Sequence, residues 1–311
     1  MKAQLPNTKK RYKIRKKLRR AEDALLQIFI VAIVLFLCAS IILPCLNIIA
    51  LAFNDGADAA RGGVYFFPRV FTLDNFKEVF KDGQIIRAYG ITIARTVICT
   101  VLSIWLITMT AFVLKIRTLP GRTFFTMAIA LTMLFSGGLI PTYIQYKNLG
   151  LLNSFWVYII PGVISAYYLF MVRTFFETIP YSLEESAMID GCNYVGIYTR
   201  IILPLSKPVI AVIGLYTAVG HWNDWFAGAF YMNSSRLWPV QTVLQQMLRK
   251  AMAASKEGAT ISQLIAAQAR AATSDSLKMA AVVITMLPIL CVYPFIQKYF
   301  AKGVMIGSVK G

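Results

Sequence analysis

Long apolar runs without a charged side chain dominate this sequence and restrict what it can fold into. Five such runs begin at Ala24, Thr96, Thr123, Leu149 and Met279. A sixth, from residue 208 to 232, contains a single acidic residue. Each is long enough to cross about 30 Å of hydrocarbon as a helix. We therefore expect six membrane-spanning helices, over residues 24–53, 93–114, 123–146, 152–172, 207–231 and 278–298.

The composition supports an integral membrane protein with an all-α fold. Of the 311 residues, 58% are hydrophobic and only 15% are charged, and the mean hydropathy is +0.62. Soluble domains carry more charge than this. The first span is not expected to be a cleaved signal peptide, because its apolar run far exceeds the usual 7 to 15 residues.

The distribution of lysine and arginine predicts the orientation of the spans. The tail, residues 1–23, holds ten basic groups and no acid in its first 20 positions, and the whole chain has a net charge of +18. Basic segments beside apolar spans stay in the cytoplasm. We interpret the tail as a topology signal that contacts anionic lipid, rather than as a nucleic-acid site.

The remaining loops agree with a multi-pass protein of the cell membrane whose two termini are cytoplasmic. Basic residues crowd the turn after the second span and the C-terminus, at Lys115, Arg117, Arg122, Lys298, Lys302 and Lys310. The loop 233–275 is expected outside although it holds five basic residues and two acids. Long loops follow the charge rule poorly, so this does not change the prediction.

One polar segment, residues 180–204, lies between the fourth and fifth spans and is expected in the cytoplasm. Ser182 and Glu185 have the spacing of a capping box, which predicts a helix that begins at Leu183. Gly191 can adopt the left-handed conformation that ends a helix. A second amphipathic stretch, 194–204, follows. The segment is thus predicted to form a helix, a turn and a helix that contact a soluble partner.

The same segment resembles the EAA loop of type I ABC importer permeases. The matching positions are Glu185-Ser186-Ala187, Gly191, Ile201 and Leu203-Pro204. The family has alanine where this chain has Ser186, which exchanges one small residue for another. In this family the loop forms a coupling helix that docks in a cleft of the ATP-binding subunit. The resemblance implies that the all-helical chain is a six-span permease with a cytoplasmic coupling helix.

The resemblance also assigns residues to coupling. Small side chains allow close approach, glycine allows the turn, and Glu184 or Glu185 offers a carboxylate to the partner; Glu185 can instead serve its own helix cap, or do both. The implied coupling residues are Ser182, Glu184, Glu185, Ser186, Ala187, Asp190, Gly191, Leu203 and Pro204.

Other segments are similar to the maltose-type carbohydrate branch of these permeases. They are Asn47, residues 149–161 and the C-terminal segment 297–311. Residues 137–143 are similar to permeases for oligosaccharides derived from complex polysaccharides. The implied partners are a second homologous permease, two ATP-binding subunits that hold ATP and magnesium, an extracytoplasmic solute-binding protein and an oligosaccharide.

The chain itself is expected to have no catalytic residues, cofactor or metal. It lacks the G-x-x-x-x-G-K-[ST] loop that binds nucleotide phosphates. Its only histidine is His221, and its five cysteines have no paired spacing. The ATPase must therefore be a separate chain.

Polar groups at membrane depth are costly unless they face a cavity or a partner. Aromatic faces and amide or carboxylate groups suit a sugar. The candidate pathway residues are Asn47, Tyr143, Gln145, Trp222, Asn223, Asp224 and Trp225. The tryptophans can equally form an interfacial aromatic belt, with Asp224 extending outward. Ser136, Gly137, Gly138 and Pro141 are expected to interrupt the third span, which either exposes carbonyl groups to the pathway or allows close helix packing.

The outer loop is predicted to contain an amphipathic helix after Pro239. Its apolar positions are Val240, Val243, Leu244, Met247 and Leu248. This helix could line an external gate, meet the binding protein, rest on the bilayer or contact the neighbouring subunit. The alanine-rich run 261–272 is also predicted to be helical. Alternative functions are an ion-coupled secondary transporter, an ABC permease for a solute other than sugar, and a membrane scaffold or sensor.

Overall fold

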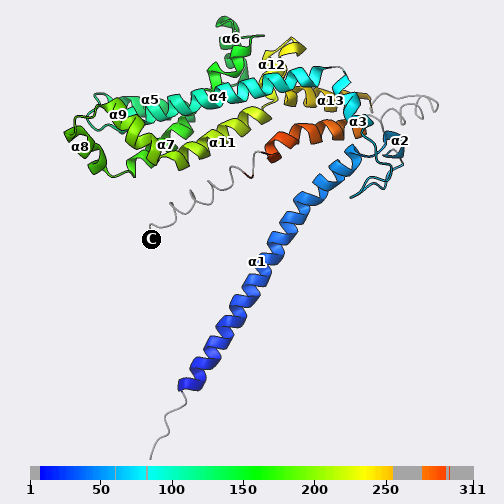
Figure 1. Cartoon of the computed structure of the whole chain (residues 1–311), viewed down its shortest axis with the longest axis horizontal. Helices are drawn as coiled ribbons and strands as arrows, with labels where there is room; N and C mark the ends of the chain where they lie inside the picture. The colour runs from blue at the N-terminus through cyan, green and yellow to red at the C-terminus, as the bar shows by residue number, and fades with distance from the viewer. Residues whose placement is uncertain (1–7, 60, 82, 255–274, 292–293, 295–311) are drawn as a thin grey trace, which may run out of the picture.

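A computed structural model of the chain describes residues 8–59, 61–81, 83–254, 275–291 and 294. Within these ranges the fold is helical, and the extended contact is one isolated bridge between Asn54 and Phe71. Most helices gather into an elongated bundle, while the first one stands away from it (Figure 1).

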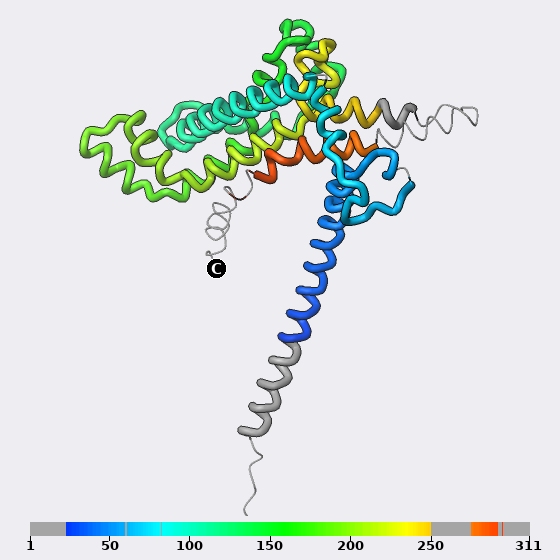
Figure 2. Tube along the Cα trace, turned by 45° about the vertical axis from the view of Figure 1, so that its right-hand side comes forward, coloured from blue at the N-terminus to red at the C-terminus, as the bar shows by residue number. Residues whose placement is uncertain are grey.

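The first helix, α1 (Thr8–Ala52), continues through Pro44. None of the 18-residue window that marks its membrane span is buried within the chain. Both views show that it meets the bundle only at its C-terminal end (Figures 1 and 2). The apolar side chains along α1 therefore need lipid or another chain to cover them.

A polar network fastens the end of α1 to the loop that follows, which contains α2 (Gly56–Ala59) and α3 (Asp74–Lys81). The Asn54 side chain is fully buried and accepts hydrogen bonds from the backbone N–H groups of Arg69 and Val70, at 2.8 and 3.0 Å. The Asn75 amide donates to the carbonyl groups of Ala52 and Asn54, both at 2.9 Å.

The central helix of the bundle is α4 (Gln84–Lys115), which packs on α7 (Ala166–Glu177) and α11 (Lys207–Asn223). A core cluster that includes Ile107, Phe176 and Ile213 joins the three helices. The helix begins at Gln84, nine residues before the predicted start of the second span at residue 93.

Three further candidate spans are bent pairs of helices rather than single rods. The predicted break in the third span is confirmed: α5 (Arg122–Leu134) and α6 (Leu139–Asn148) meet at 119°, and Gly138 between them has φ +80°. The fourth predicted span, 152–172, is not one helix. It consists of the 3-10 turns η1 (Phe155–Tyr158) and η2 (Ile160–Gly162), followed at 44° by α7.

The fifth span also differs from a single rod over 207–231. Residues Tyr194–Leu205 and α11 meet at 79°, and α11 ends at Asn223 before the short α12 (Phe226–Tyr231). The described residues contain two helices of membrane-spanning length and composition, or up to five spans when each bent pair counts as one. Of the sixth predicted span, residues 278–291 are helical and the rest lies outside the described residues, apart from residue 294.

The predicted amphipathic helix after Pro239 is confirmed as α13 (Val240–Ala254). Its apolar face packs on other helices of the chain. Val240 and Val243 are buried against Ile85 and Ala88 of α4, and against residues of the helix 275–291. This part of the apolar face therefore packs within the chain. The alanine-rich run 261–272 lies outside the described residues.

Candidate functional site

The segment 180–204 forms the predicted helix, turn and helix at one end of the bundle (Figure 1). Its first helix is α8 (Tyr181–Ile189), and the turn has Gly191 at φ +79°. The N–H of Gly191 donates to the carbonyl of Met188 and that of Cys192 to the carbonyl of Ala187. These two bonds form a Schellman motif, so the predicted role of Gly191 in ending the helix is confirmed.

The second helical stretch comprises α9 (Tyr194–Ile197), the π-helical turn η3 (Tyr198–Ile202) and α10 (Leu203–Leu205). The Asn193 side chain caps its start, since its oxygen accepts from the N–H of Gly196 at 2.8 Å. Leu203 and Pro204 lie in its last turn, directly before the bend into α11.

The predicted capping box at Ser182 and Glu185 is wrong. The helix begins at Tyr181, its N-cap residue is Pro180, and no side chain caps that end. The start of α8 depends on tertiary packing instead, because Glu184 in its first turn is buried and forms an ion pair with Lys115 at the end of α4. Only 6% of the Glu184 side chain and 10% of the Lys115 side chain are exposed.

A second polar contact fastens this segment to α4. The hydroxyl groups of Tyr198 and Thr108 are 2.8 Å apart, and the Tyr198 ring packs on Phe112 at 5.3 Å between centroids. Ile197 and Ile202 are fully buried in the same core cluster as α4 and α7. The segment is thus held to the bundle by both polar and apolar contacts.

The outward side of α8 presents small, acidic and apolar side chains together. We call it the α8 face and define it by residues that recur on one side of the helix. They are Tyr181, Ser182, Glu185, Ser186, Ile189 and Asp190, all exposed, with 81% of Ile189 accessible. Ala187, in contrast, packs inward on the core cluster. Exposed apolar side chains such as Tyr181 and Ile189 among polar residues are typical of a binding surface.

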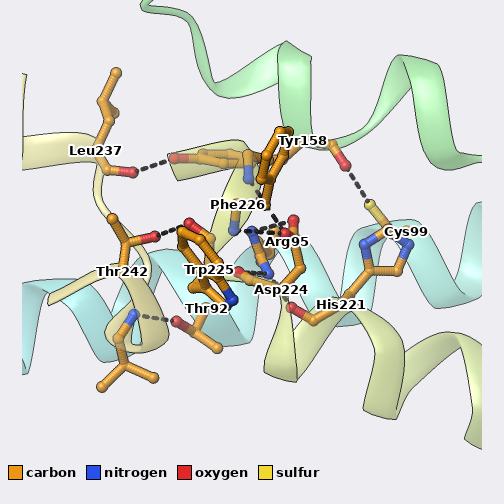
Figure 3. A network of polar contacts seen from close by, with 12 residues as sticks. Thr92, Arg95, Cys99, Tyr158, His221, Asp224, Trp225, Phe226, Leu237 and Thr242 are labelled. Carbon is orange, nitrogen blue, oxygen red and sulfur yellow. Dashed lines mark hydrogen bonds and ion pairs between the residues drawn. The ribbon is translucent and has the colours of Figure 1, made fainter. Parts of the chain in front are cut away.

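The second functional cluster lies at the break between α11 and α12 (Figure 3). The Arg95 side chain of α4 is fully buried, and its guanidinium pairs with the Asp224 carboxylate at 3.3 Å. The same guanidinium donates to the carbonyl groups of His221 and Asp224. It therefore satisfies backbone oxygens that the end of α11 leaves without helical partners.

Asp224 also serves the helix that follows. Its second carboxylate oxygen accepts hydrogen bonds from the N–H groups of Phe226 and Ala227, at 2.9 and 3.2 Å. Arg95 and Asp224 together thus supply partners to both sides of the break. Unwound backbone at membrane depth requires such partners.

Neighbouring contacts extend this cluster to three other elements, namely η1, α13 and the 3-10 turn η4 (Ser235–Leu237). The Arg95 guanidinium lies 5.0 Å from the centroid of the Tyr158 ring, whose hydroxyl donates to the carbonyl of Leu237 at 2.8 Å. The Thr92 hydroxyl accepts from the N–H of Val240 at 2.8 Å, and the Thr242 hydroxyl donates to the carbonyl of Trp225 at 2.8 Å. The break is therefore part of a connected framework, which Figure 3 shows as dashed lines.

The predicted pathway residues lie in several places. Asp224 and Trp225 belong to the cluster at the break, and the Trp222 indole donates to the carbonyl of Thr285 at 3.2 Å. Asn223 is exposed and accepts from Gln241 at 3.4 Å. Tyr143 lies on α6, where its ring stacks 6.2 Å from that of Tyr231.

Gln145 is exposed on α6. Asn47 lies apart from the break, near the C-terminal end of α1, where its amide donates to the carbonyls of Val64 and Tyr65 at 2.7 and 3.0 Å. The structure therefore does not bring the seven residues into one site.

A cavity of about 270 Å³ adjoins the break, between α4, α7 and α11. Its lining is rich in hydroxyl groups and includes no lysine or arginine. The lining residues are Ser103, Ile107, Gly162, Ser165, Tyr168, Tyr216, Thr217, Gly220, His221 and Asp224. Across the described ranges, no group of three His, Cys, Asp or Glu side chains is placed to bind a metal ion.

Sequence reasoning missed Arg95 and did not foresee the inward direction of Lys115. One signal was available for Arg95, because an ionisable residue beside an apolar run usually has a buried partner. No local pattern identifies that partner as Asp224, which is 129 positions away.

The comparison with known families gives the identity of this architecture. A family model described as "binding-protein-dependent transport system inner membrane component" matches residues 101–306. The chain belongs to this family. The resemblance to ABC importer permeases noted in the sequence is thereby confirmed.

Curated relatives and a solved structure agree over nearly the full length. The chain is 43% identical over 288 residues to protein LplC of Bacillus subtilis (strain 168), covering 92% of this chain and 96% of that protein. It is 38% identical over 290 residues to the polygalacturonan/rhamnogalacturonan transport system permease protein YtcP of the same organism, covering 93% and 100%.

The solved structure is described as a bacterial ABC transporter involved in the import of the acidic polysaccharide alginate. One of its chains matches with a TM-score of 0.80 and 27% identity, over 90% of this permease and 98% of that chain. The names of YtcP and of the alginate transporter refer to carbohydrates, in agreement with the sequence.

Proposed function

We propose that this permease is a subunit of an ATP-driven importer of oligosaccharides. The observation that carries the proposal is the α8 face, an exposed helix surface that is fastened to the central helix α4 by buried contacts. A force applied to this face reaches the membrane helices directly. Ser182, Glu185, Ser186, Asp190 and Gly191 are exposed and suit docking, whereas Glu184 is not available to a partner.

The proposed partner at the α8 face is an ATPase subunit with bound ATP and magnesium. This permease contains no phosphate-binding loop of its own. Two ATPase copies would serve one copy of this permease and one homologous permease. The α8 face then lies in the cytoplasm together with both termini, in agreement with the basic residues at the two ends of the chain.

The uncovered helices support pairing with a second permease. None of the residues of α5 and α6 is buried, and the membrane window of α1 is uncovered as well. Lipid can cover part of these surfaces, and a homologous subunit would cover the part that faces the pathway. An extracytoplasmic binding protein would deliver the solute to the opposite end of the pair.

The proposed substrate is an oligosaccharide because several relatives are named for such solutes. They include an arabinooligosaccharide permease of Halalkalibacterium halodurans and a maltodextrin permease of Bacillus subtilis. The hydroxyl-rich cavity beside the break is compatible with a polyhydroxylated solute.

The deciding experiment is uptake into vesicles that contain the purified assembly and its binding protein. The solutes are arabino-, malto- and galacturonate oligosaccharides, each supplied with ATP inside or with a proton gradient alone. We expect uptake of at least one that requires ATP and ignores the gradient. Uptake driven by the gradient without ATP would instead support a secondary transporter. ATP-dependent uptake of a non-sugar solute alone would keep the ABC mechanism and reject the carbohydrate assignment.

A further inference from the structure

We infer that Lys115 and Glu184 are positioning residues for coupling. Their buried ion pair makes α8 and α4 move as one unit, so that a displacement of the α8 face is transmitted along α4 to Arg95. The inference rests on the proposed function and goes beyond it, because it assigns Glu184 to an internal contact rather than to the ATPase.

The surroundings of the pair support this role. Lys115 is the last residue of α4 and Arg117 lies in the turn that follows, but Arg117 is exposed and only Lys115 points inward. Likewise, of the two adjacent acids in α8, Glu185 is exposed and Glu184 is buried. Arg117 and Glu185 are thus available to solvent or a partner, whereas Lys115 and Glu184 bind each other within the chain.

Stability alone does not explain the ion pair. Removing two charges from water costs about as much as their attraction returns, so apolar residues of similar size are usually as stabilising. A buried pair does, however, define one position for the elements that it joins. Here it fixes the first turn of α8, whose end has no side-chain cap, against the last turn of α4.

The other end of α4 completes the argument. Arg95 lies 20 residues before Lys115 on the same uninterrupted helix, which corresponds to about 30 Å. There it binds the carboxylate and carbonyl groups at the break between α11 and α12. The Tyr198–Thr108 contact holds the second helical stretch to the middle of α4. One rigid helix therefore connects the α8 face with the break.

The test uses the reconstituted assembly with its binding protein and the oligosaccharide that the wild type imports fastest. The variants are Lys115→Met, Glu184→Gln and both together. We expect each single variant to lower the binding-protein-stimulated ATPase rate per assembled complex by about tenfold, and the double variant to be no worse. Exchanging the charges, with Lys115→Glu and Glu184→Lys combined, should restore at least part of the stimulation.

Two matched controls separate this role from loss of charge. Arg117→Met removes an exposed basic group from the turn that follows Lys115. Glu177→Gln removes an acid that is 42% exposed at the end of α7. Both should keep wild-type stimulation. The amount of ATPase subunit that copurifies with each variant corrects for lost assembly.

Three outcomes would overturn the inference. If Lys115→Met retains wild-type stimulation while Glu184→Gln does not, Glu184 acts on the ATPase and not through Lys115. If all the loss of activity is accounted for by lost assembly, the pair is only structural. If the wild type imports nothing with ATP, the proposed function fails and the inference fails with it, a result that is visible before any variant is compared.

Discussion

Arg95 is the residue on which the break between α11 and α12 depends most. It is fully buried, it pairs with the Asp224 carboxylate, and it donates hydrogen bonds to two carbonyl groups. Replacing it with an apolar residue leaves a carboxylate and two backbone oxygens without these partners. Asp224 keeps its two backbone N–H donors and 33% of its side chain is exposed, so the local cost is smaller than for a fully buried, unpaired charge.

We predict that Arg95→Met destabilises the permease by about 1–3 kcal/mol. The double variant Arg95→Met with Asp224→Asn should recover part of this, because asparagine is neutral and its oxygen can still accept from the N–H groups at the start of α12. Thermal unfolding of the purified assembly measures both. Arg87→Met, an exposed arginine on the same helix, is the control and should unfold like the wild type. Equal stability of Arg95→Met and wild type would contradict the prediction.

Substitutions at Gly191 can distinguish an effect on the backbone of the turn from an effect on the docking of a partner. Its φ is +79°, and a Cβ added there meets no atom within 4 Å. Replacing Gly191 therefore destabilises the chain only through the left-handed backbone conformation. The cost is about 1–2 kcal/mol for a residue such as valine and less for asparagine. The space around Gly191 remains available to an ATPase.

We therefore expect Gly191→Asn to preserve the amount of folded permease while it lowers ATPase stimulation, because its side chain enters the docking space. Gly191→Val should lower both. Copurification of the ATPase subunit and stimulated ATP hydrolysis distinguish the two effects. If Gly191→Asn couples as well as the wild type, the turn does not approach the ATPase closely.

At the scale of elements, the loop between α1 and α3 is held by hydrogen bonds to the Asp58 carboxylate. The Asn54 amide and the Arg69 guanidinium both donate to the Asp58 carboxylate, at 3.0 Å. These contacts, that of Asn54 first, lower the pKa of Asp58 below its usual 3.8. The stabilisation is therefore present above about pH 4 and is lost as the pH falls through the lowered pKa.

The corresponding prediction compares the wild type with Asp58→Asn in thermal melts from about pH 6 to about pH 3. The wild type should have the higher Tm at the upper end of this range, and the difference should shrink toward the lower end as Asp58 takes up a proton. A difference that stays constant with pH would show that the carboxylate charge does not hold the loop.

At the scale of the whole molecule, uncovered apolar surface is the dominant feature. The membrane window of α1 has no burial, and neither α5 nor α6 contains a buried residue. Figures 1 and 2 show α1 leaning away from the bundle, where nothing in the described part of the chain supports it. A second permease that binds only the folded state would raise its stability by mass action.

We expect the chain purified alone in detergent to melt several degrees below the same chain in the assembly. The Tm of the isolated subunit is measured by the loss of helical circular dichroism. The Tm of the same chain in the assembly is measured with a label on α1, and the two values are compared. An identical Tm in the two states would mean that detergent replaces the partner fully and that the uncovered helices face lipid.

The sequence by itself determined the features that depend on local chemistry. Apolar runs predicted the membrane-length helices α1 and α4, Gly191 predicted the turn after α8, and the spacing from Val240 predicted α13. Each of these follows from hydropathy, backbone conformation or helical period, which neighbouring residues define.

Tertiary structure decided which polar residues face inward. Ser182 and Glu185 have the spacing of a cap, yet the fold buries Glu184 against Lys115 and leaves Glu185 outside. Arg95 pairs with Asp224, which is 129 positions away in the sequence. That contact stabilises the backbone where α11 ends at Asn223. Such pairs form only where packed helices bring distant residues together, because an ion pair at membrane depth depends on the partner across the interface and not on its neighbours in the chain.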